Sequence, residues 1–130
     1  MKGKYVLLLA GCMVATSLFA MNEVDKKGRK QGEWTKKYEN GLVMYTGTFK
    51  DDNPVGEFRR FYESGALNSI QNHKANDVSD ILIYEEDGKT LSAKGSYKGK
   101  IKDGKWIYYV EEKISLEEYY LDGKLNGVSK

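Results

Sequence analysis

The sequence predicts an all-β fold in which tandem β-hairpins of about 24 residues form an elongated, twisted antiparallel meander sheet. The first observation is a recurring pair, a small residue followed two positions later by a bulky one. The second is a turn signal containing Gly seven positions after most of the bulky residues. The third is that no stretch after residue 20 has the apolar spacing of a helix. The units start near Gly32, Gly56, Ser79 and Gly104, and a truncated unit opens at Gly127.

Residues 1–20 are predicted to be a signal peptide that forms a helix ahead of the sheet. Lys2 and Lys4 give a positive start, and an apolar run then continues to Ala20. This pattern is typical of a secretory signal, and the run is shorter than the roughly 20 apolar residues of a membrane-spanning helix. We expect cleavage after Ala20. The alternative is lipidation at Cys12, because the preceding Leu-Ala-Gly resembles the lipobox of bacterial lipoproteins.

Composition indicates a folded domain that has no net charge once the signal is removed. With 40% hydrophobic and 31% charged residues, the chain is not a disordered tail. The formal net charge is +2, but the signal holds two lysines and no acid, so the remainder has a net charge of 0. That balance argues against binding to nucleic acid through a basic surface. Cys12 is the only Cys, so the mature chain can form neither a disulfide nor a thiolate metal site.

The first unit shows the plan most clearly. Residues 21–31 are polar and are predicted to be a flexible lead-in. An aromatic strand begins at Trp34, and the pair Asn40-Gly41 favours the positive φ angles of a tight type I′ hairpin turn. Residues 42–49 are apolar and aromatic at intervals and are expected to form the return strand.

Later units repeat this plan with less regular turns. Gly65 and Gly88 stand at the second and third turns, whereas Lys113 occupies that position in the fourth. The second unit departs most, because its return segment is polar and residues 75–80 replace the Gly-rich link. A lone hairpin is marginally stable in water, so the units are expected to pair side by side. Their bulky residues then form a structural ladder on one face: Trp34, Phe58, Ile81 and Trp106.

No group of residues predicts catalysis, and we interpret the chain as non-enzymatic, with no cofactor and no bound metal. An enzyme needs a nucleophile or an acid–base pair in a defined arrangement. His73 is the only His and is expected to be exposed in an irregular loop. The acidic pairs lie in or beside predicted turns, where water solvates them. Residues 51–53, Asp-Asp-Asn, lack the remaining spacing of a calcium-binding EF-hand loop.

Tyrosines outside the ladder are the candidate interaction residues. Neighbours on a strand point to opposite faces, so the pairs Tyr108-Tyr109 and Tyr119-Tyr120 each place one ring on either face. A tyrosine ring offers a large contact area with a polar tip, which suits a protein partner or stacking on a sugar. A structural role on a sheet with two half-buried faces is the alternative. The candidate face comprises Tyr45, Tyr84, Tyr108, Tyr109, Tyr119 and Tyr120.

The pattern Gly-x-Trp, then Asn-Gly or Asp-Gly, then Gly-x-Phe or Gly-x-Tyr resembles the variant MORN repeat of bacteria. It is similar to repeats of proteins catalogued as YwqK-type antitoxin components. The resemblance covers residues 32–127 of a predicted repeat domain at 32–130, and it departs at Ser79, at Lys113 and across residues 67–80. It implies β-hairpin repeats that contact a protein or a membrane. The antitoxin role fits poorly with an export signal, since antitoxins act in the cytoplasm.

These patterns predict an exported protein, periplasmic or extracellular, that acts as a protein-interaction or envelope scaffold module. A protein partner is expected and nucleic acid is not. One alternative is an envelope lipoprotein, attached to the outer membrane through Cys12, that contacts lipid or glycan. Another is an antitoxin-like binding partner of a toxin.

Overall fold

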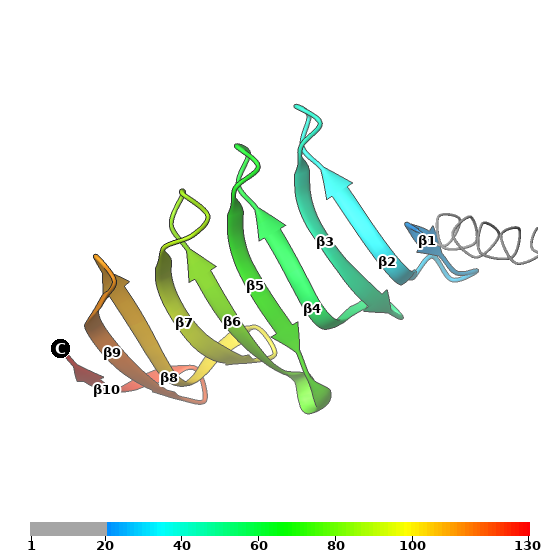
Figure 1. Ribbon diagram of the computed structural model, residues 1–130. Coiled ribbons are helices and arrows are strands. Elements are labelled where there is room, and N and C mark those ends of the chain that lie inside the picture. Colours follow the sequence, from blue (N-terminus) through cyan, green and yellow to red (C-terminus); the bar gives the residue numbers. More distant parts are fainter. Residues whose placement is uncertain (1–20) are drawn as a thin grey trace, which may run out of the picture.

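The computed structural model describes residues 21–130, which form one antiparallel sheet of ten strands in chain order (Figure 1). The predicted all-β meander is therefore confirmed. The expected signal helix, its cleavage site and Cys12 lie outside the described residues. The strands are β1 (Glu23–Val24), β2 (Lys30–Lys37), β3 (Val43–Lys50), β4 (Asn53–Phe61), β5 (Leu67–His73), β6 (Val78–Tyr84), β7 (Leu91–Lys98), β8 (Ile101–Val110), β9 (Lys113–Leu121) and β10 (Lys124–Ser129), and a short 3-10 turn, η1 (Ala75–Asp77), joins β5 to β6.

Successive hairpins lie beside one another, and their tips step along one side of the sheet from β2–β3 to β8–β9 (Figure 1). Each strand is hydrogen-bonded only to the strands before and after it in the sequence. The sheet is a single layer, so a side chain is buried only by its neighbours on the same face. Large aromatic and branched residues are needed on such a surface because cross-strand packing is its main source of stability.

Residues 21–31, predicted as a flexible lead-in, contain the two-residue strand β1 and the start of β2. β1 pairs with the start of β2, and the turn between them is organised by Asp25. One carboxylate oxygen of Asp25 accepts hydrogen bonds from the backbone N–H groups of Lys27 and Arg29, each at 2.9 Å. A polar segment forms an ordered turn here because one aspartate satisfies several donors at once.

The turn at Asn40-Gly41 is not the two-residue type I′ turn that the sequence suggested. The Tyr38 N–H donates to the Leu42 carbonyl at 2.8 Å, and the Gly41 N–H donates to the Tyr38 carbonyl at 3.0 Å. The turn therefore holds three residues, and of these only Gly41 has a positive φ, +88°. The Asn40 side chain instead accepts a hydrogen bond from the Leu42 N–H at 2.9 Å. Gly65 and Gly88 take positive φ in the next two tips.

Two-residue turns with positive φ at both positions occur at the Asp122-Gly123 pair between β9 and β10 and at two acidic pairs. Asp51 and Asp52 have φ of +52° and +68°, and Glu111 and Glu112 have φ of +51° and +67°. Both pairs have the backbone signs of a type I′ turn. The fourth tip therefore closes before Lys113, which is the first residue of β9 and needs no glycine.

The four ladder residues share one face of the sheet, which we call the ladder face. In the register, Trp34 pairs with Gly47, Phe58 with Gln71, Ile81 with Gly95 and Trp106 with Glu118. The exposed fractions of Phe58, Ile81 and Trp106 are 4%, 8% and 1%, and Trp34 is half-buried. The buried core of this sheet is thus a row of side chains across it and not an enclosed interior.

Two ladder rings lie directly on glycines of the preceding strand. The β3–β4 register shifts at Gly47 and the β7–β8 register shifts at Gly95, so the partner strand bulges at each place. A Cβ atom at Gly47 would stand 2.1 Å from Phe58, and one at Gly95 would stand 2.1 Å from the Trp106 indole. No side chain fits at either position, because the ring occupies that space.

The β5–β6 pair has no such bulge, and this accounts for Ser79. Gly56 and Gly104 open the bulges of β4 and β8 with φ of +69° and +72°, values that favour glycine. Between β5 and β6 the register runs without a shift, so the equivalent position needs no positive φ and accepts Ser79. Gln71 of β5 takes the place that Gly47 has in β3 and Gly95 has in β7. Its partner Ile81 takes the place of the aromatic ring.

A lysine covers the rings at each end of the ladder. The Lys30 ammonium lies 5.1 Å from the ring centroids of both Trp34 and Phe49. The Lys102 ammonium lies 4.6 Å from the Trp106 centroid and donates to the Tyr108 hydroxyl at 2.7 Å. Each lysine stem shields a ring face that a single-layer sheet would leave in water, and each ammonium gains a cation–π contact.

Candidate functional site

The six candidate tyrosines divide between the two faces and do not form one surface. Tyr45 and Tyr108 lie on the ladder face, where each stacks on a ladder ring with centroids 5.1 Å and 6.3 Å apart. Tyr120 also lies there, and Lys102 lies over its ring at 5.2 Å. Strand alternation places the other three on the opposite face: Tyr84, Tyr109 and Tyr119.

The tyrosines on the ladder face contribute mainly to packing. Tyr45 belongs to an N-terminal aromatic cluster, and Tyr108 to a C-terminal one. The N-terminal cluster comprises Trp34, Tyr45, Phe49 and Phe58. The C-terminal cluster comprises Tyr97, Trp106 and Tyr108.

A hollow of about 730 Å³ opens on the ladder face between these two clusters. It lies over β4 to β7, where the ladder has Ile81 and Gln71 in place of a ring seated on a glycine. Its rim comes from Pro54 near the start of β4, Asp77 in η1 and Lys100 in the β7–β8 turn. The smaller ladder residue and the unbulged register therefore leave a concave surface at the centre of the sheet.

The floor of the hollow is polar and ordered. Ser69, Gln71 and Ser79 are all buried, with 2%, 9% and 3% of their surface exposed. The Gln71 amide N–H donates to the Ser79 hydroxyl at 2.8 Å, and the Gln71 amide oxygen accepts from Arg60 at 3.1 Å. These bonds fix the amide orientation, because its donor and acceptor ends are both engaged.

Arg60 stands at the edge of the hollow as an accessible cation without an acidic partner. Its guanidinium lies 4.7 Å from the Phe58 ring centroid and donates to the Gln71 amide. The other two arginines both contact carboxylates, Arg29 at 2.8 Å and Arg59 at 2.6 Å, whereas Arg60 forms no ion pair within residues 21–130. Burial lowers the pKa of Arg60, and two nearby tyrosines act in the opposite direction. The group is a cation at every physiological pH.

His73 is the last residue of β5 and lines the hollow, so the expectation of an exposed loop histidine is wrong. Its ring packs edge-on against Phe58 with centroids 6.1 Å apart, and its Nε2 atom is buried without a hydrogen-bond partner in the described chain. Burial lowers the pKa of His73, and the positive charge of Arg60 lowers it further, while Asp77 raises it. The neutral imidazole is therefore favoured in the folded protein.

We expect the protein to lose stability as pH falls below about 6.5, the ordinary pKa of histidine. Because the folded pKa of His73 is lowered, the unfolded chain binds more protons in this window. The contribution is fully present above the unfolded pKa and is lost as pH falls through the folded one. Urea unfolding at about pH 7.5 and about pH 5.5 measures it. His73→Asn should remove most of the difference, and an equal drop in that variant would contradict the assignment to His73, the only histidine.

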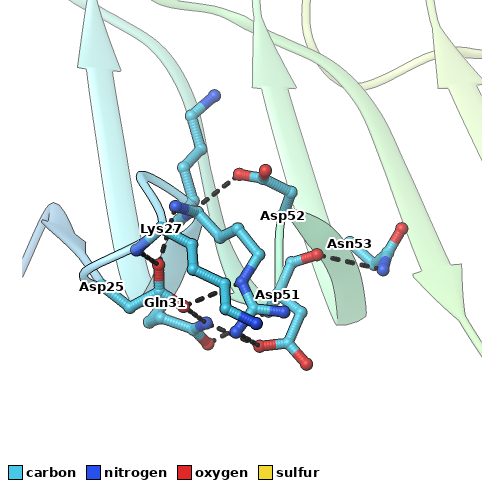
Figure 2. A network of polar contacts seen from close by, with 8 residues as sticks. Asp25, Lys27, Gln31, Asp51, Asp52 and Asn53 are labelled. Carbon is cyan, nitrogen blue, oxygen red and sulfur yellow. Dashed lines mark hydrogen bonds and ion pairs between the residues drawn. The ribbon is translucent and has the colours of Figure 1, made fainter.

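Acidic residues of the β1–β2 turn and the β3–β4 turn are joined through Gln31. Gln31 donates to Asp25 at 3.0 Å and to Asp51 at 2.7 Å, tying the β1–β2 turn to the β3–β4 turn (Figure 2). Asp52 accepts from the Lys30 N–H at 2.6 Å. No group of three or more acidic, His or Cys residues within 21–130 is arranged to hold a metal ion.

Replacing Asp25 with asparagine should release the β1–β2 turn from β3–β4. Hydrogen bonds from backbone and side-chain donors, that of Arg29 foremost, hold the pKa of Asp25 at about 2 against an ordinary 3.8. Its stabilising effect is therefore present above pH 3.8 and lost as pH falls through about 2. Amide hydrogen exchange at Lys27 and Arg29 should speed up in Asp25→Asn at neutral pH. Asp122→Asn, in a distant turn, is the control and should leave these two amides unchanged.

Sequence reasoning missed the residues that line the hollow, above all Arg60, Gln71 and Ser69. One signal was present, since Ser69, Gln71 and His73 alternate along β5 on the face that carries the apolar residues Phe58, Ile81 and Ile83 of the neighbouring strands. Three polar residues on a core-facing period indicate a hydrogen-bonded floor. By its repeat pattern alone this segment reads only as a weak copy of the unit.

Comparison with protein families, with curated proteins and with solved structures returns no match for this chain. Within residues 21–130 no helix is long and apolar enough to cross a membrane.

Proposed function

We propose that this is an exported, non-enzymatic array of MORN-like hairpin repeats that binds a protein partner through its ladder face. The repeated seating of a ring on a glycine, Phe58 on Gly47 and Trp106 on Gly95, supports the repeat interpretation. Support for export comes from the sequence of residues 1–20. A repeat sheet of this kind offers an extended binding surface built by several units.

The observation that carries the proposal is the hollow over β4 to β7, where the ladder departs from its own pattern. The departure replaces packed rings with hydrogen-bonding groups that are already ordered, including the Gln71 amide and the Arg60 guanidinium. A concave surface with a few fixed polar groups among apolar ones is typical of a binding site. Preorganised groups lose little freedom on binding, which favours affinity.

Capture of partners from the cell envelope with two matched variants of the full chain tests the proposal. Ile83 lines the hollow, whereas its neighbour Leu82 lies on the opposite face and is 36% exposed. A partner held by the ladder face should be lost with Ile83→Arg and kept with Leu82→Arg. Equal capture by both variants would overturn the assignment of the face. Retention on protein-free liposomes or polysaccharide, in place of a protein, would favour the lipid or glycan alternative.

The mature protein is expected to begin at Met21, because cleavage after Ala20 is typical of a secretory signal. Mass spectrometry of the protein recovered from the envelope measures this start. A chain that begins with a lipid-modified Cys12 would establish the lipoprotein alternative instead. An uncleaved cytoplasmic chain would contradict export and would favour the antitoxin-like role.

A further inference from the structure

We propose that the hollow on the ladder face is a carboxylate-binding site anchored by Arg60. The inference deepens the proposed function and rests on it, because it names the chemical group that a partner presents to this surface. It is carried by three features of the described residues: an unpaired guanidinium, an ordered polar floor beside it, and a cavity of suitable size.

The Arg60 side chain is held in place and retains free donors. Packing over Phe58 at 4.7 Å and the bond to Gln71 at 3.1 Å restrict its position. A guanidinium has five N–H donors in a planar fork, and the bond to Gln71 uses one nitrogen of it. The fork matches the two oxygens of a carboxylate, which is the preferred partner for a planar cation. No acid of residues 21–130 takes this place.

The groups around Arg60 suit an anion that also has neutral polar contacts. Tyr45 is its direct cross-strand neighbour on β3, and Ser69 is its neighbour on β5. Tyr97 and Lys100 also line the hollow, and Asp77 is the one acid among its lining residues. The lining of the hollow therefore holds two cations, Arg60 and Lys100, and one carboxylate, Asp77.

The cavity volume sets the size of the ligand. At about 730 Å³ the hollow lies within the 300–1,000 Å³ range of ordinary ligand sites. It admits an acidic side chain with its flanking backbone, or one uronic-acid sugar. These two sources share the carboxylate and differ in everything else, so the experiment treats them separately.

The test uses the full chain labelled with ¹⁵N-arginine, which gives three guanidinium Nε–H signals because the sequence has only three arginines. The single histidine, His73, supplies a second reporter inside the hollow. The probes are a capped alanyl-glutamyl-alanine peptide and glucuronate, each added at constant ionic strength. Their matched controls are the glutaminyl peptide and glucose, which lack the carboxylate. We expect saturable shifts of the Arg60 and His73 signals with an acidic probe only, while the Arg29 and Arg59 signals stay in place.

Two variants separate binding from general charge. Arg60→Gln should weaken acidic-probe binding, read at His73, by roughly tenfold or more, the range for losing a hydrogen bond to a charged group. Arg59→Gln, which removes the neighbouring arginine paired with Glu57, should leave it unchanged. Tighter binding of the peptide or of glucuronate identifies the source of the carboxylate, and either result supports the site.

Equal shifts at all three arginines, equal responses to the neutral probes, or an unchanged response in Arg60→Gln would each overturn the carboxylate site. The proposed function fails separately. If a protein partner is lost with Ile83→Arg while no acidic probe binds, the ladder face binds its partner by other means and only the carboxylate inference is wrong.

Discussion

Replacing Trp106 with alanine is expected to lower the free energy of unfolding by about 3–5 kcal/mol, the usual cost of deleting a buried aromatic side chain. Trp106 is 1% exposed and is the most buried large side chain among the described residues. It packs edge-on against Tyr97 with centroids 5.1 Å apart, and its indole N–H donates to the Ser96 carbonyl at 2.9 Å. The substitution removes the ring, uncovers Gly95 and takes away the cation–π contact of Lys102.

Urea unfolding followed by circular dichroism measures this loss, and Trp34→Ala is the matched control. Trp34 occupies the equivalent ladder position but is only half-buried, so its substitution should cost clearly less. Equal costs for the two tryptophans would show that ladder position, and not burial, determines stability. A loss below about 1 kcal/mol for Trp106→Ala would contradict its burial in solution.

Adding a single methyl group at Gly95 should cost about 1–3 kcal/mol or more, the range for overpacking a closely packed core. The new Cβ would stand 2.1 Å from the Trp106 indole, and the indole cannot move aside without losing its bond to Ser96. Gly95 does not have a positive φ, so the penalty comes from the ring and not from the backbone. The unfolding midpoint in urea measures it.

Gly127→Ala is the control because Gly127 also lies in a strand, has no positive φ and has its nearest neighbour, Tyr119, at 3.6 Å from the added Cβ. That change should be neutral or stabilising by up to about 1 kcal/mol, since alanine restricts the unfolded chain more than glycine. In a Trp106→Ala background, Gly95→Ala should lose most of its cost, because the ring that it clashes with is gone. A cost that persists in the double variant would show that the ring is not the cause.

The spacing of bulky residues predicted the meander and the ladder because a strand has a strict two-residue alternation. Once Trp34, Phe58 and Trp106 are placed on one face, their strand neighbours fall on the other. Turn geometry was harder to predict. Asn40-Gly41 carries the signal of a type I′ turn, yet the Asn40 side chain bonds to the Leu42 N–H and a three-residue turn forms. The preference of the Asn-Gly pair for a two-residue turn is therefore overridden in the β2–β3 hairpin.

The candidate site was less predictable from the sequence because it lies where two neighbouring strands, β5 and β6, depart from the repeat pattern. Ser79 and Gln71 appear in the sequence as degraded copies of repeat glycines. Only the register shows that the two changes belong together, since an unbulged β5–β6 pair both permits Ser79 and brings Gln71 within 2.8 Å of it. The role of Arg60 depends on which face it occupies and on the lack of a nearby carboxylate, neither of which composition reveals.

The strictly sequential strand order also determines how the molecule comes apart. When each strand bonds only to its neighbours in the chain, stability is close to a sum of adjacent interfaces, and opening starts at the two ends. β1 and β10 should therefore fray first, with fast amide hydrogen exchange, while β4 to β7 exchange slowly. The hollow is placed over these central strands, so its geometry should survive local opening of the termini. The same order gives low contact order for a β protein, which favours rapid folding from any internal hairpin.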